Sequence, residues 1–347
     1  MRRPRSVETA EVDGRHVLVR ADLNVPLEAG RVADDTRIRG ALRTLRWLLD
    51  ARAAEVVVCS HLGRPKGVDP AFGIAPVAER LAELVPDPRL RVLENTRFDP
   101  GETTNDPDTA ARLAEGMDLF VEDAFGSVHR AHASTVGVAE RLPTYAGFLL
   151  LDELDHLGRL LGDVARPFVL VAGGAKVEDK LGVLRHLGGR ADTVIVGGKM
   201  AEELRVENPL EFPVELPVDV VAAESFAADA RTEVASVDAI PAGWLGLDIG
   251  PESRERFAGI LRGAGTIFWN GPMGVFEWEA FAAGTQAVAE AVADADAYSV
   301  VGGGDSVRAI NELGLADRVS WVSTGGGASL ELLEGRELPG VAVIPEA

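Results

Sequence analysis

Short apolar runs rich in β-branched residues alternate along the chain with segments of helical periodicity. Nine of these runs have the length and composition of strands: residues 16–20, 55–59, 90–94, 118–122, 167–172, 193–196, 266–269, 298–301 and 319–322. Strands that alternate with helices in this way are typical of α/β domains with parallel sheets. We therefore expect an α/β fold in which the first four strands and the last five form separate sets.

Three segments show the helical pattern most clearly. Between the first two strands, Thr36 is placed to cap a helix whose apolar residues recur at helical spacing: Ile38, Leu42, Leu45, Leu48 and Leu49. Residues 279–295 predict a second helix, and residues 149–164 predict an amphipathic one between the two sets of strands. The last is the natural connector, so we expect one domain over 1–150 and another over 151–335. The apolar, proline-bounded tail at 336–347 is expected to dock back on the first domain.

Composition narrows the class of protein. The 347 residues are 46% hydrophobic and 26% charged, which is typical of a soluble globular protein with two domains. No apolar run reaches the length needed to span a bilayer, and the basic N-terminus lacks the apolar region of a signal peptide. The single cysteine, Cys59, ends an apolar run, so we interpret it as a core residue. One cysteine allows no internal disulfide and fits a reducing, cytoplasmic location.

The charge is unevenly distributed. The net charge of −20 argues against nucleic acid or an anionic membrane as a partner. Residues 1–150 hold 20 basic and 23 acidic residues, whereas residues 151–347 hold 15 and 32. A small acidic substrate should therefore prefer the first half. Only four of the 35 cations are lysines, and each lies in or beside a glycine-containing turn: Lys66, Lys176, Lys180 and Lys199. Coding bias could explain why lysine is so rare. The alternative explanation is that the four lysines mark a phosphate-binding site.

The two sets of strands end in different kinds of loop. First-half strands run into charged loops such as "RADLNVP", "SHLGRPK" and "ENTRF", whereas second-half strands run into "GGAK", "GGKM", "NGPMG", "GGGDS" and "STGGG". Ligands bind at the carboxyl ends of parallel strands, and glycine lets phosphate approach the backbone near a helix N-terminus. No Walker A motif and no dinucleotide fingerprint are present. Asp305 in "GGGDS" could cap a helix or hold the Mg²⁺ that accompanies a nucleotide.

The motifs resemble those of the phosphoglycerate kinase family in content and order, nearly from end to end. They include "VLVRADLNVP", "SHLGRPKG", "EDAFGSVHRAHASTVG", "GGAKVEDK", "WNGPMGVFE", "VVGGGDS" and "VSTGGGASLELLEG". The resemblance implies two Rossmann-like domains with parallel sheets joined by a hinge helix. It also implies a usually monomeric glycolytic kinase that transfers a phosphoryl group reversibly between 1,3-bisphosphoglycerate with ADP and 3-phosphoglycerate with MgATP.

Matching positions give the residues that the resemblance implies. The substrate-binding residues would be Asp22, Leu23, Asn24, Arg37, His61, Leu62, Gly63, Arg64, Arg97 and Arg130. The nucleotide-binding residues would be Gly173, Gly174, Lys176, Lys180, Gly198, Gly246, Asn270, Pro272, Glu277, Gly303, Gly304, Asp305 and Ser306, with Asp305 as the Mg²⁺ ligand. The catalytic residues would be Arg37, Lys176, Lys180, Gly325 and Gly326. Arginine forks suit the phosphate and carboxylate of 3-phosphoglycerate, and Asp22 suits its hydroxyl.

The chain also departs from the family pattern. Relative to that pattern it is shortened after "LAELV" and after "GGKMAEEL", and the second deletion removes part of the adenine wall. Lys199 stands where a small residue is usual, and Glu122 where Asn is usual. We expect Lys199 to reach the nucleotide and partly replace lost contacts. The alternative function is a non-catalytic or weakened binding protein on the same scaffold.

Overall fold

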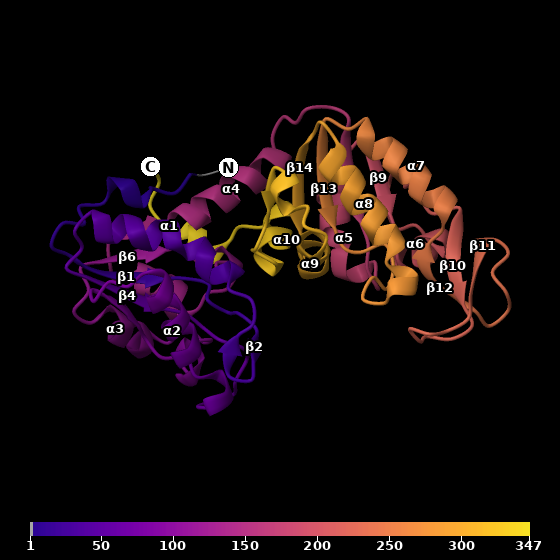
Figure 1. The fold of residues 1–347 in the computed structure, drawn as a ribbon. Helices are drawn as coiled ribbons and strands as arrows, with labels where there is room; N and C mark the ends of the chain where they lie inside the picture. The colour runs from indigo at the N-terminus through magenta and orange to yellow at the C-terminus, as the bar shows by residue number, and fades with distance from the viewer. Residues whose placement is uncertain (1–2) are drawn as a thin grey trace. The chain divides into compact units, whose positions relative to one another are not determined.

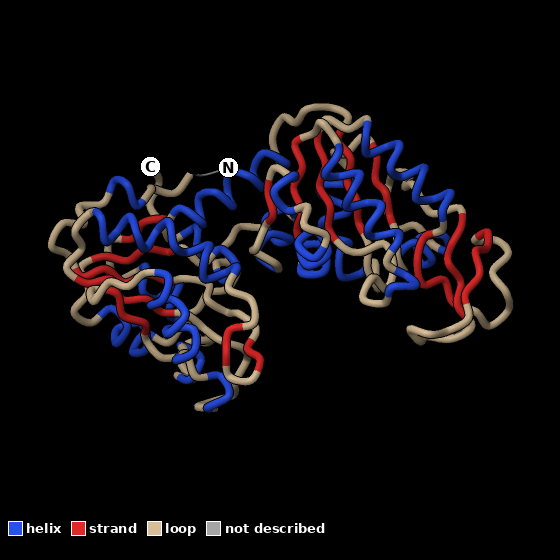
Figure 2. The backbone as a smooth tube through the Cα atoms, in the orientation of Figure 1, coloured by secondary structure: helices blue, strands red, loops and turns tan. Residues whose placement is uncertain are grey.

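The computed structural model describes residues 3–347, which form two compact units. One unit runs up to Asp155 and includes Glu337–Ala347, and the other is His156–Arg336. Each unit contains a five-stranded parallel sheet with helices packed against it (Figures 1 and 2). The expected α/β fold with parallel sheets is therefore confirmed.

The first sheet has the strand order β5-β4-β1-β6-β7. Its strands are β1 (His16–Arg20), β4 (Glu55–Cys59), β5 (Leu90–Val92), β6 (Leu119–Glu122) and β7 (Thr144–Ala146), and a short hairpin pairs β2 (Leu27–Glu28) with β3 (Arg31–Val32). The helices of this unit are α1 (Thr36–Asp50), α2 (Ala75–Leu84), α3 (Pro107–Ala114) and α11 (Pro339–Ala342).

Alternate residues of β1 supply two separate cores. Val17 and Val19 pack with the apolar faces of α1 and α2, and Leu18 packs on the opposite face with Phe120 and Cys59. This alternation follows from the two-residue period of a strand, and burial on both faces explains why the central strands are continuous apolar runs. The interpretation of Cys59 as a core residue is confirmed, and burial raises the pKa of its thiol to about 12.

The C-terminal segment lies against the first unit. The Gly340 amide donates to the Val128 carbonyl at 2.8 Å, and the Arg5 amide donates to the Pro345 carbonyl at 2.8 Å. Ile344 and Leu338 are buried. The tail thus contributes apolar surface to the unit that begins the chain.

The second unit adds an antiparallel sheet to its parallel one. The parallel sheet has the order β15-β14-β13-β8-β9 and the antiparallel sheet the order β11-β10-β12. The strands are β8 (Phe168–Ala172), β9 (Thr193–Val196), β10 (Asp219–Ala223), β11 (Thr232–Ser236), β12 (Leu245–Ile249), β13 (Thr266–Asn270), β14 (Tyr298–Gly302) and β15 (Trp321–Val322). The helices are α5 (Leu181–Val183), α6 (Lys199–Val206), α7 (Pro251–Arg262), α8 (Ala283–Asp294), α9 (Gly304–Glu312) and α10 (Gly327–Leu333).

Several predicted boundaries differ from the structure. Thr36 does not cap α1: it is the first helical residue, and its own amide donates to the Asp34 carboxylate at 2.8 Å. The connector helix α4 is Phe148–Leu160 rather than 149–164, and α8 begins at Ala283 after a short 3₁₀ turn at Glu279–Phe281. The antiparallel sheet was not predicted from the sequence. No helix among residues 3–347 is long and apolar enough to cross a bilayer.

The N-terminus of α4 is held by side chains of the first unit. The Asp123 carboxylate, just after β6, accepts from the amides of Leu149 (2.9 Å) and Leu150 (3.2 Å). The Thr44 hydroxyl accepts from the Phe148 amide at 3.0 Å. These bonds satisfy amides that have no partner within the helix.

Candidate active site

The predicted substrate residues of the first unit follow four neighbouring parallel strands. They are Asp22 and Asn24 after β1, His61 and Arg64 after β4, Arg97 after β5, and Arg130 after β6. Because the carboxyl ends of parallel strands share one edge of a sheet, these residues gather there. Arg37 joins them from the first turn of α1. We call Arg37, His61, Arg64, Arg97 and Arg130 the cationic basin.

The basin is strongly electropositive. Burial and then the neighbouring charges of Arg130, Arg64 and Arg20 lower the pKa of Arg97. Within residues 3–347, no carboxylate forms an ion pair with Arg64, Arg97 or Arg130. The Nε of Arg97 is buried without a hydrogen bond, although its Nη1 donates to the Gly63 carbonyl at 2.8 Å. Three neighbouring arginines without acidic partners among the described residues are suited to an anionic ligand.

His61 is held as a neutral hydrogen-bond donor. The guanidinium of Arg20 lies 3.0 Å from His61 Nδ1, and because arginine can only donate, Nδ1 must accept. Its proton therefore resides on Nε2. Burial, followed by the charge of Arg20, places the pKa of His61 well below its usual value. The ring is thus a fixed, uncharged donor.

Arg20 is a residue that the sequence analysis missed. It is fully buried at the end of β1, where its Nε donates to the Ser134 hydroxyl at 2.9 Å. The only sequence signal was a charged residue that closes an otherwise apolar run, which is equally typical of a strand that reaches the surface.

Asp22 forms an ion pair with Arg37 and is itself almost completely buried. The pair lies against Gly126, where a Cβ atom would overlap the Asp22 carboxylate. A side chain at position 126 would therefore displace the pair. The predicted residues Asp22 and Arg37 therefore bind each other through this ion pair, and both also face the basin.

Three further predicted substrate residues shape the loops of this edge. The Asn24 side chain accepts from the Gly63 amide at 2.8 Å. Leu23 and Leu62 are buried, so their side chains belong to the core, and the Leu62 amide donates to the Asn95 side chain at 3.1 Å. Asn95 was not predicted, yet its amide group also donates to the Leu62 carbonyl at 2.8 Å.

The second unit contains a cavity of about 630 Å³ whose walls are α6, β12 and the loops after β8, β9, β13 and β14. Six residues of the predicted nucleotide set line it: Gly174, Gly198, Gly246, Pro272, Glu277 and Asp305. Its apolar walls include Phe226, Val237 and Ile240. A cavity lined both by glycines and by apolar side chains suits a ligand that joins phosphates to a planar ring. We call it the nucleotide cavity.

Lys180 lies beside the glycine-lined part of the cavity. Its ammonium donates to the Asn270 carbonyl at 2.8 Å. Burial lowers the pKa of Lys180 to about 8, and the charges of Asp305 and Asp179 oppose that shift. The Asn270 side chain in turn donates to the Gly302 carbonyl at 2.9 Å. The loops after β13 and β14 are thereby joined.

Asp305 does not cap α9, so one of the two sequence interpretations is wrong. The residue before the helix is Gly303, which adopts φ +89°, and Asp305 lies within the first turn. The Asp305 side chain is exposed, lines the nucleotide cavity and has no hydrogen bond within residues 3–347. Gly304 starts the helix, and the Ser306 hydroxyl accepts from the Gly271 amide.

Gly325 and Gly326 precede the short helix α10. The Gly325 amide donates to the Ser323 hydroxyl at 3.3 Å, and Gly326 adopts φ +54°. Lys176 is exposed in the loop after β8, and Gly173 packs against the Pro272 backbone. All predicted nucleotide and catalytic residues of the second unit therefore lie at or beyond the carboxyl ends of β8, β9, β13, β14 and β15, or within β12.

The residues present fit a magnesium ion that is held mainly by its nucleotide. Among residues 3–347, no group of three or more His, Cys, Asp or Glu side chains could hold a metal. Asp305 supplies one exposed carboxylate without a protein partner, and Mg²⁺ typically takes one or two carboxylates plus phosphate oxygens and water.

Three charged residues that line the cavity were not predicted as part of it: Glu202, Arg205 and Asp248. Lys199, which was expected to reach the nucleotide, lines the cavity as well. Burial raises the pKa of Asp248 to about 7, and its carboxylate accepts from the Gly284 amide at 2.7 Å. That Lys199 contacts the nucleotide stays a prediction, which ADP titration of Lys199→Ala would test.

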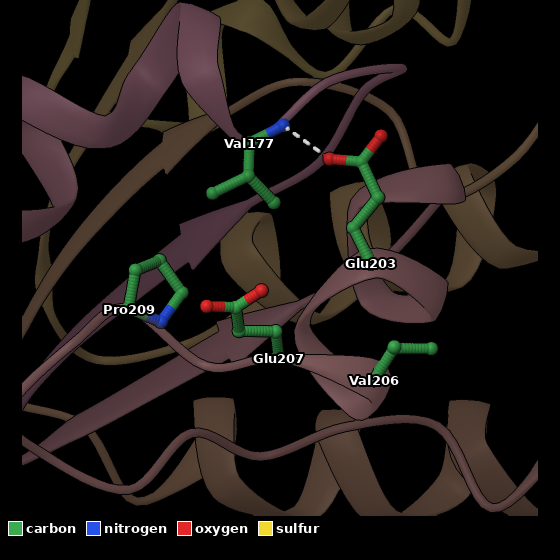
Figure 3. A pocket seen from close by; sticks show the side chains of 5 residues that line it. All are labelled: Val177, Glu203, Val206, Glu207 and Pro209. Carbon is green, nitrogen blue, oxygen red and sulfur yellow. Dashed lines mark hydrogen bonds between the residues drawn. The ribbon is translucent and has the colours of Figure 1, made fainter.

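A smaller hollow lies beside α6 and is lined by Val177, Glu203, Val206, Glu207 and Pro209 (Figure 3). The Glu203 carboxylate accepts from the Val177 amide at 3.0 Å. In the first turn of α6, the Met200 amide donates to the Gly174 carbonyl at 3.1 Å. Helix α6 thus anchors the loop that contains Lys176 on both sides of that lysine.

Comparison with known proteins was made for the whole chain. The family model described as phosphoglycerate kinase matches residues 7–212 and 207–336. The chain is 53% identical to the phosphoglycerate kinase of Rubrobacter xylanophilus, over 99% of this chain and 98% of that protein. It is 48% identical to that of Chloroflexus aurantiacus, over 99% of each. The first alignment extends over 386 residues, more than the 347 present here, so that relative has segments with no counterpart in this chain.

Solved structures give the same result. The structure of phosphoglycerate kinase from Coxiella burnetii matches with a TM-score of 0.87 and 37% identity over 98% of each chain. The structure of phosphoglycerate kinase from Pyrococcus horikoshii matches with a TM-score of 0.83 and 30% identity, also over 98% of each.

Proposed function

Because the chain belongs to the phosphoglycerate kinase family, we propose that the cationic basin binds 3-phosphoglycerate and the nucleotide cavity binds ATP or ADP. The enzyme is a phosphotransferase of glycolysis, and its reaction exchanges a phosphoryl group between 1,3-bisphosphoglycerate with ADP and 3-phosphoglycerate with ATP. The observation that supports the assignment of the basin best is the set Arg64, Arg97 and Arg130, which has no acidic ion-pair partner within residues 3–347. The phosphate and carboxylate of 3-phosphoglycerate would supply those partners.

The main barrier to the reaction is electrostatic. In the ATP-consuming direction the nucleophile is a carboxylate that is already ionised at neutral pH, so it needs no general base. Two unit charges 4 Å apart repel each other by roughly 4 kcal/mol at an effective dielectric of 20. Enzymatic phosphoryl transfer depends mainly on positioning and on neutralising the oxygens of the transferred group.

The residues of the first unit would orient the acceptor. Arg37 would contact the substrate carboxylate and the transferred group, with its guanidinium held by Asp22. Asp22 would also accept from the substrate hydroxyl. His61 would donate its Nε2 proton to a substrate oxygen without changing its charge.

The residues of the second unit would neutralise the polyphosphate. Lys176 would contact the transferred phosphoryl group, Lys180 the nucleotide phosphates, and the backbone amides at 325–327 the equatorial oxygens. Glu277 would accept from the ribose hydroxyls. Asp305 would hold Mg²⁺, which supplies further positive charge to the phosphates when it is bound.

The non-catalytic alternative has no support from the comparisons, because the relatives described above are named as phosphoglycerate kinases over the whole chain. Each position assigned to catalysis also retains a chemically competent residue. We further propose that the protein is a cytoplasmic monomer, which light scattering of the purified chain would test for the oligomeric state.

A coupled assay for ATP-dependent phosphorylation of 3-phosphoglycerate tests the function and the assignment of Lys176 together. We expect turnover by the natural chain. Lys176→Ala should lower kcat by orders of magnitude while leaving the affinity for 3-phosphoglycerate nearly unchanged. Lys66→Ala is the control, because Lys66 is an exposed turn residue of the first unit. A kcat close to that of the natural chain in Lys176→Ala would remove Lys176 from the mechanism.

A further inference from the structure

Helix α6 presents three charged side chains to the nucleotide cavity at intervals of three residues: Lys199, Glu202 and Arg205. Residues three apart lie on the same side of a helix, so the three form a row. Lys199 is at the end next to Gly198, and the row continues away from it along the helix. Glu202 therefore lies about 4.5 Å further along the axis than Lys199.

Glu202 lies directly beside the wall formed by β12. A Cβ atom built on Gly246 would lie 3.2 Å from Glu202 Oε1 and 3.4 Å from the side chain of Val220. The Glu202 carboxylate and the Val220 side chain therefore lie against Gly246 on the cavity wall. A planar ring that entered the cavity beside this wall would have an edge near Glu202.

The Glu202 carboxylate is available to a ligand. Within residues 3–347 it has no hydrogen bond or ion pair, and Lys199 is not within ion-pair distance of it. Arg205, on the next turn, donates to the Pro217 carbonyl at 2.6 Å. Partial burial raises the pKa of Glu202, and the charge of Lys199 opposes that shift.

The position along the cavity assigns Glu202 to the nucleobase. Gly198 lies against Gly174 and Pro272, on the side that suits phosphates, whereas Val220 packs with Val237 and Ile240 on the apolar side. Glu202 belongs to the first turn of α6, and its carboxylate lies beside Gly246 and Val220, on the apolar side. Glu277, the residue proposed for the ribose, lines the same cavity.

We propose that Glu202 contacts the edge of the nucleobase and makes this kinase favour 6-oxopurine nucleotides, those of guanine and hypoxanthine, over adenine nucleotides. The proposal rests on the assignment of this cavity to the nucleotide. A carboxylate offers only acceptors. Guanine presents two adjacent donors, N1–H and the 2-amino group, which match its two oxygens. Adenine presents a donor next to the N1 lone pair, which faces the carboxylate unfavourably.

The test exploits the difference between a carboxylate and an amide. An amide both donates and accepts, so glutamine pairs bidentately with adenine. Values of kcat/KM for GTP, ITP and ATP would be measured for the natural chain and for Glu202→Gln, Glu202→Leu and Glu207→Gln. Glu207 is the matched control, because it lines the neighbouring hollow and not the nucleotide cavity (Figure 3).

We expect the natural chain to use GTP at least as well as ATP. The GTP/ATP ratio should fall about tenfold or more in Glu202→Gln, which corresponds to about 1.4 kcal/mol of discrimination, and it should also fall in Glu202→Leu. It should not change in Glu207→Gln. An unchanged ratio in both Glu202 variants would overturn the proposal.

Calorimetric titration of the natural chain with ADP and GDP gives a result that needs no variant. Binding of GDP as tight as or tighter than that of ADP is expected, and ADP binding more than tenfold tighter would overturn the proposal. Failure of the proposed function gives a different result, since the natural chain would then turn over none of the three nucleotides.

Discussion

Lys180 combines a half-buried ammonium with a pKa of about 8, and this combination predicts the pH dependence of nucleotide use. A lysine is charged below its pKa and neutral above it. The attraction of Lys180 for phosphate should therefore be complete below pH 7 and be lost as the pH rises through 8. We predict that kcat/KM for ATP declines above pH 8, because this parameter reports groups of the free enzyme.

Lys180→Arg is the control for that profile. Arginine stays protonated throughout this range, so the decline near pH 8 should disappear even if the maximum rate is lower. A natural chain whose kcat/KM stays constant up to pH 9.5 would contradict the assignment of Lys180 to the phosphates.

Glu122 is a second residue whose protonation has a measurable effect. It is fully buried at the end of β6, where one carboxylate oxygen accepts from the Ala124 amide at 2.9 Å and the other has no hydrogen-bond partner among residues 3–347. Burial raises its pKa to about 8, against 4.5 for the ordinary group. Between these values the folded chain holds a proton that the unfolded chain releases, so stability should fall as the pH rises from 4.5 to 8.

Glu122→Gln should remove that contribution, since the amide is neutral and keeps an acceptor for Ala124. We predict that this variant has a higher Tm than the natural chain at pH 8 and that the difference shrinks toward pH 5. Asp123, whose pKa burial raises to about 7, contributes a slope of the same sign that the variant retains. The exposed Glu115→Gln serves as the control, and a difference in Tm that does not vary with pH would count against this account.

At the scale of elements, α6 determines how firmly the loop that contains Lys176 is held. The bond from the Val177 amide to the Glu203 carboxylate joins the residue after Lys176 to the helix (Figure 3). Hydrogen bonds to charged groups contribute about 1.5–3 kcal/mol. Loss of this bond should therefore allow Lys176 to leave its position more often.

We predict that Glu203→Ala lowers kcat about fivefold to tenfold with little change in the KM for 3-phosphoglycerate. Glu203→Gln should restore most of the loss because its side-chain carbonyl can still accept from Val177. Glu207→Ala, in the same hollow, should behave like the natural chain. Equal kinetics for all three variants would show that the bond does not position Lys176.

The elements themselves differed in how well the sequence predicted them. Central strands such as β8, buried on both faces, are continuous apolar runs and were found. Strand β11 has one buried residue among five, so it shows no apolar run, and the antiparallel sheet went unnoticed. The start of α1 was misplaced by one residue because Asp34, Asp35 and Thr36 are all residues that favour a helix start.

The sequence predicted only those site residues that its motifs and the order of its strands place in particular loops. Strand ends brought Arg64, Arg97 and Arg130 to one edge, as the parallel topology requires. The rotation of α6 about its axis is set by tertiary packing, so the sequence did not show that Glu202 faces the cavity and Glu203 the loop. Nor did it show that Arg20 turns inward to His61.

At the scale of the whole molecule, the reactants are assigned to different compact units. The cationic basin belongs to the unit that ends at Asp155, and the nucleotide cavity belongs to His156–Arg336. The chain passes between the units at Asp155–His156, within α4, and again at Arg336–Glu337. Phosphoryl transfer requires the attacking oxygen to come within about 3–3.5 Å of phosphorus. Both ligands must therefore be brought together for each turnover.

We predict that the protein with 3-phosphoglycerate and a non-hydrolysable ATP analogue bound together is more compact than the free protein in small-angle X-ray scattering. Binding of either ligand alone is the control, since each would leave one of the two anion-binding sites unfilled and should give a smaller change. The physical reason is that the charges of Arg37 and Lys176 neutralise the same transferred group only when both ligands are present. A radius of gyration that is unchanged in the ternary complex would mean that domain closure does not accompany the reaction in this enzyme.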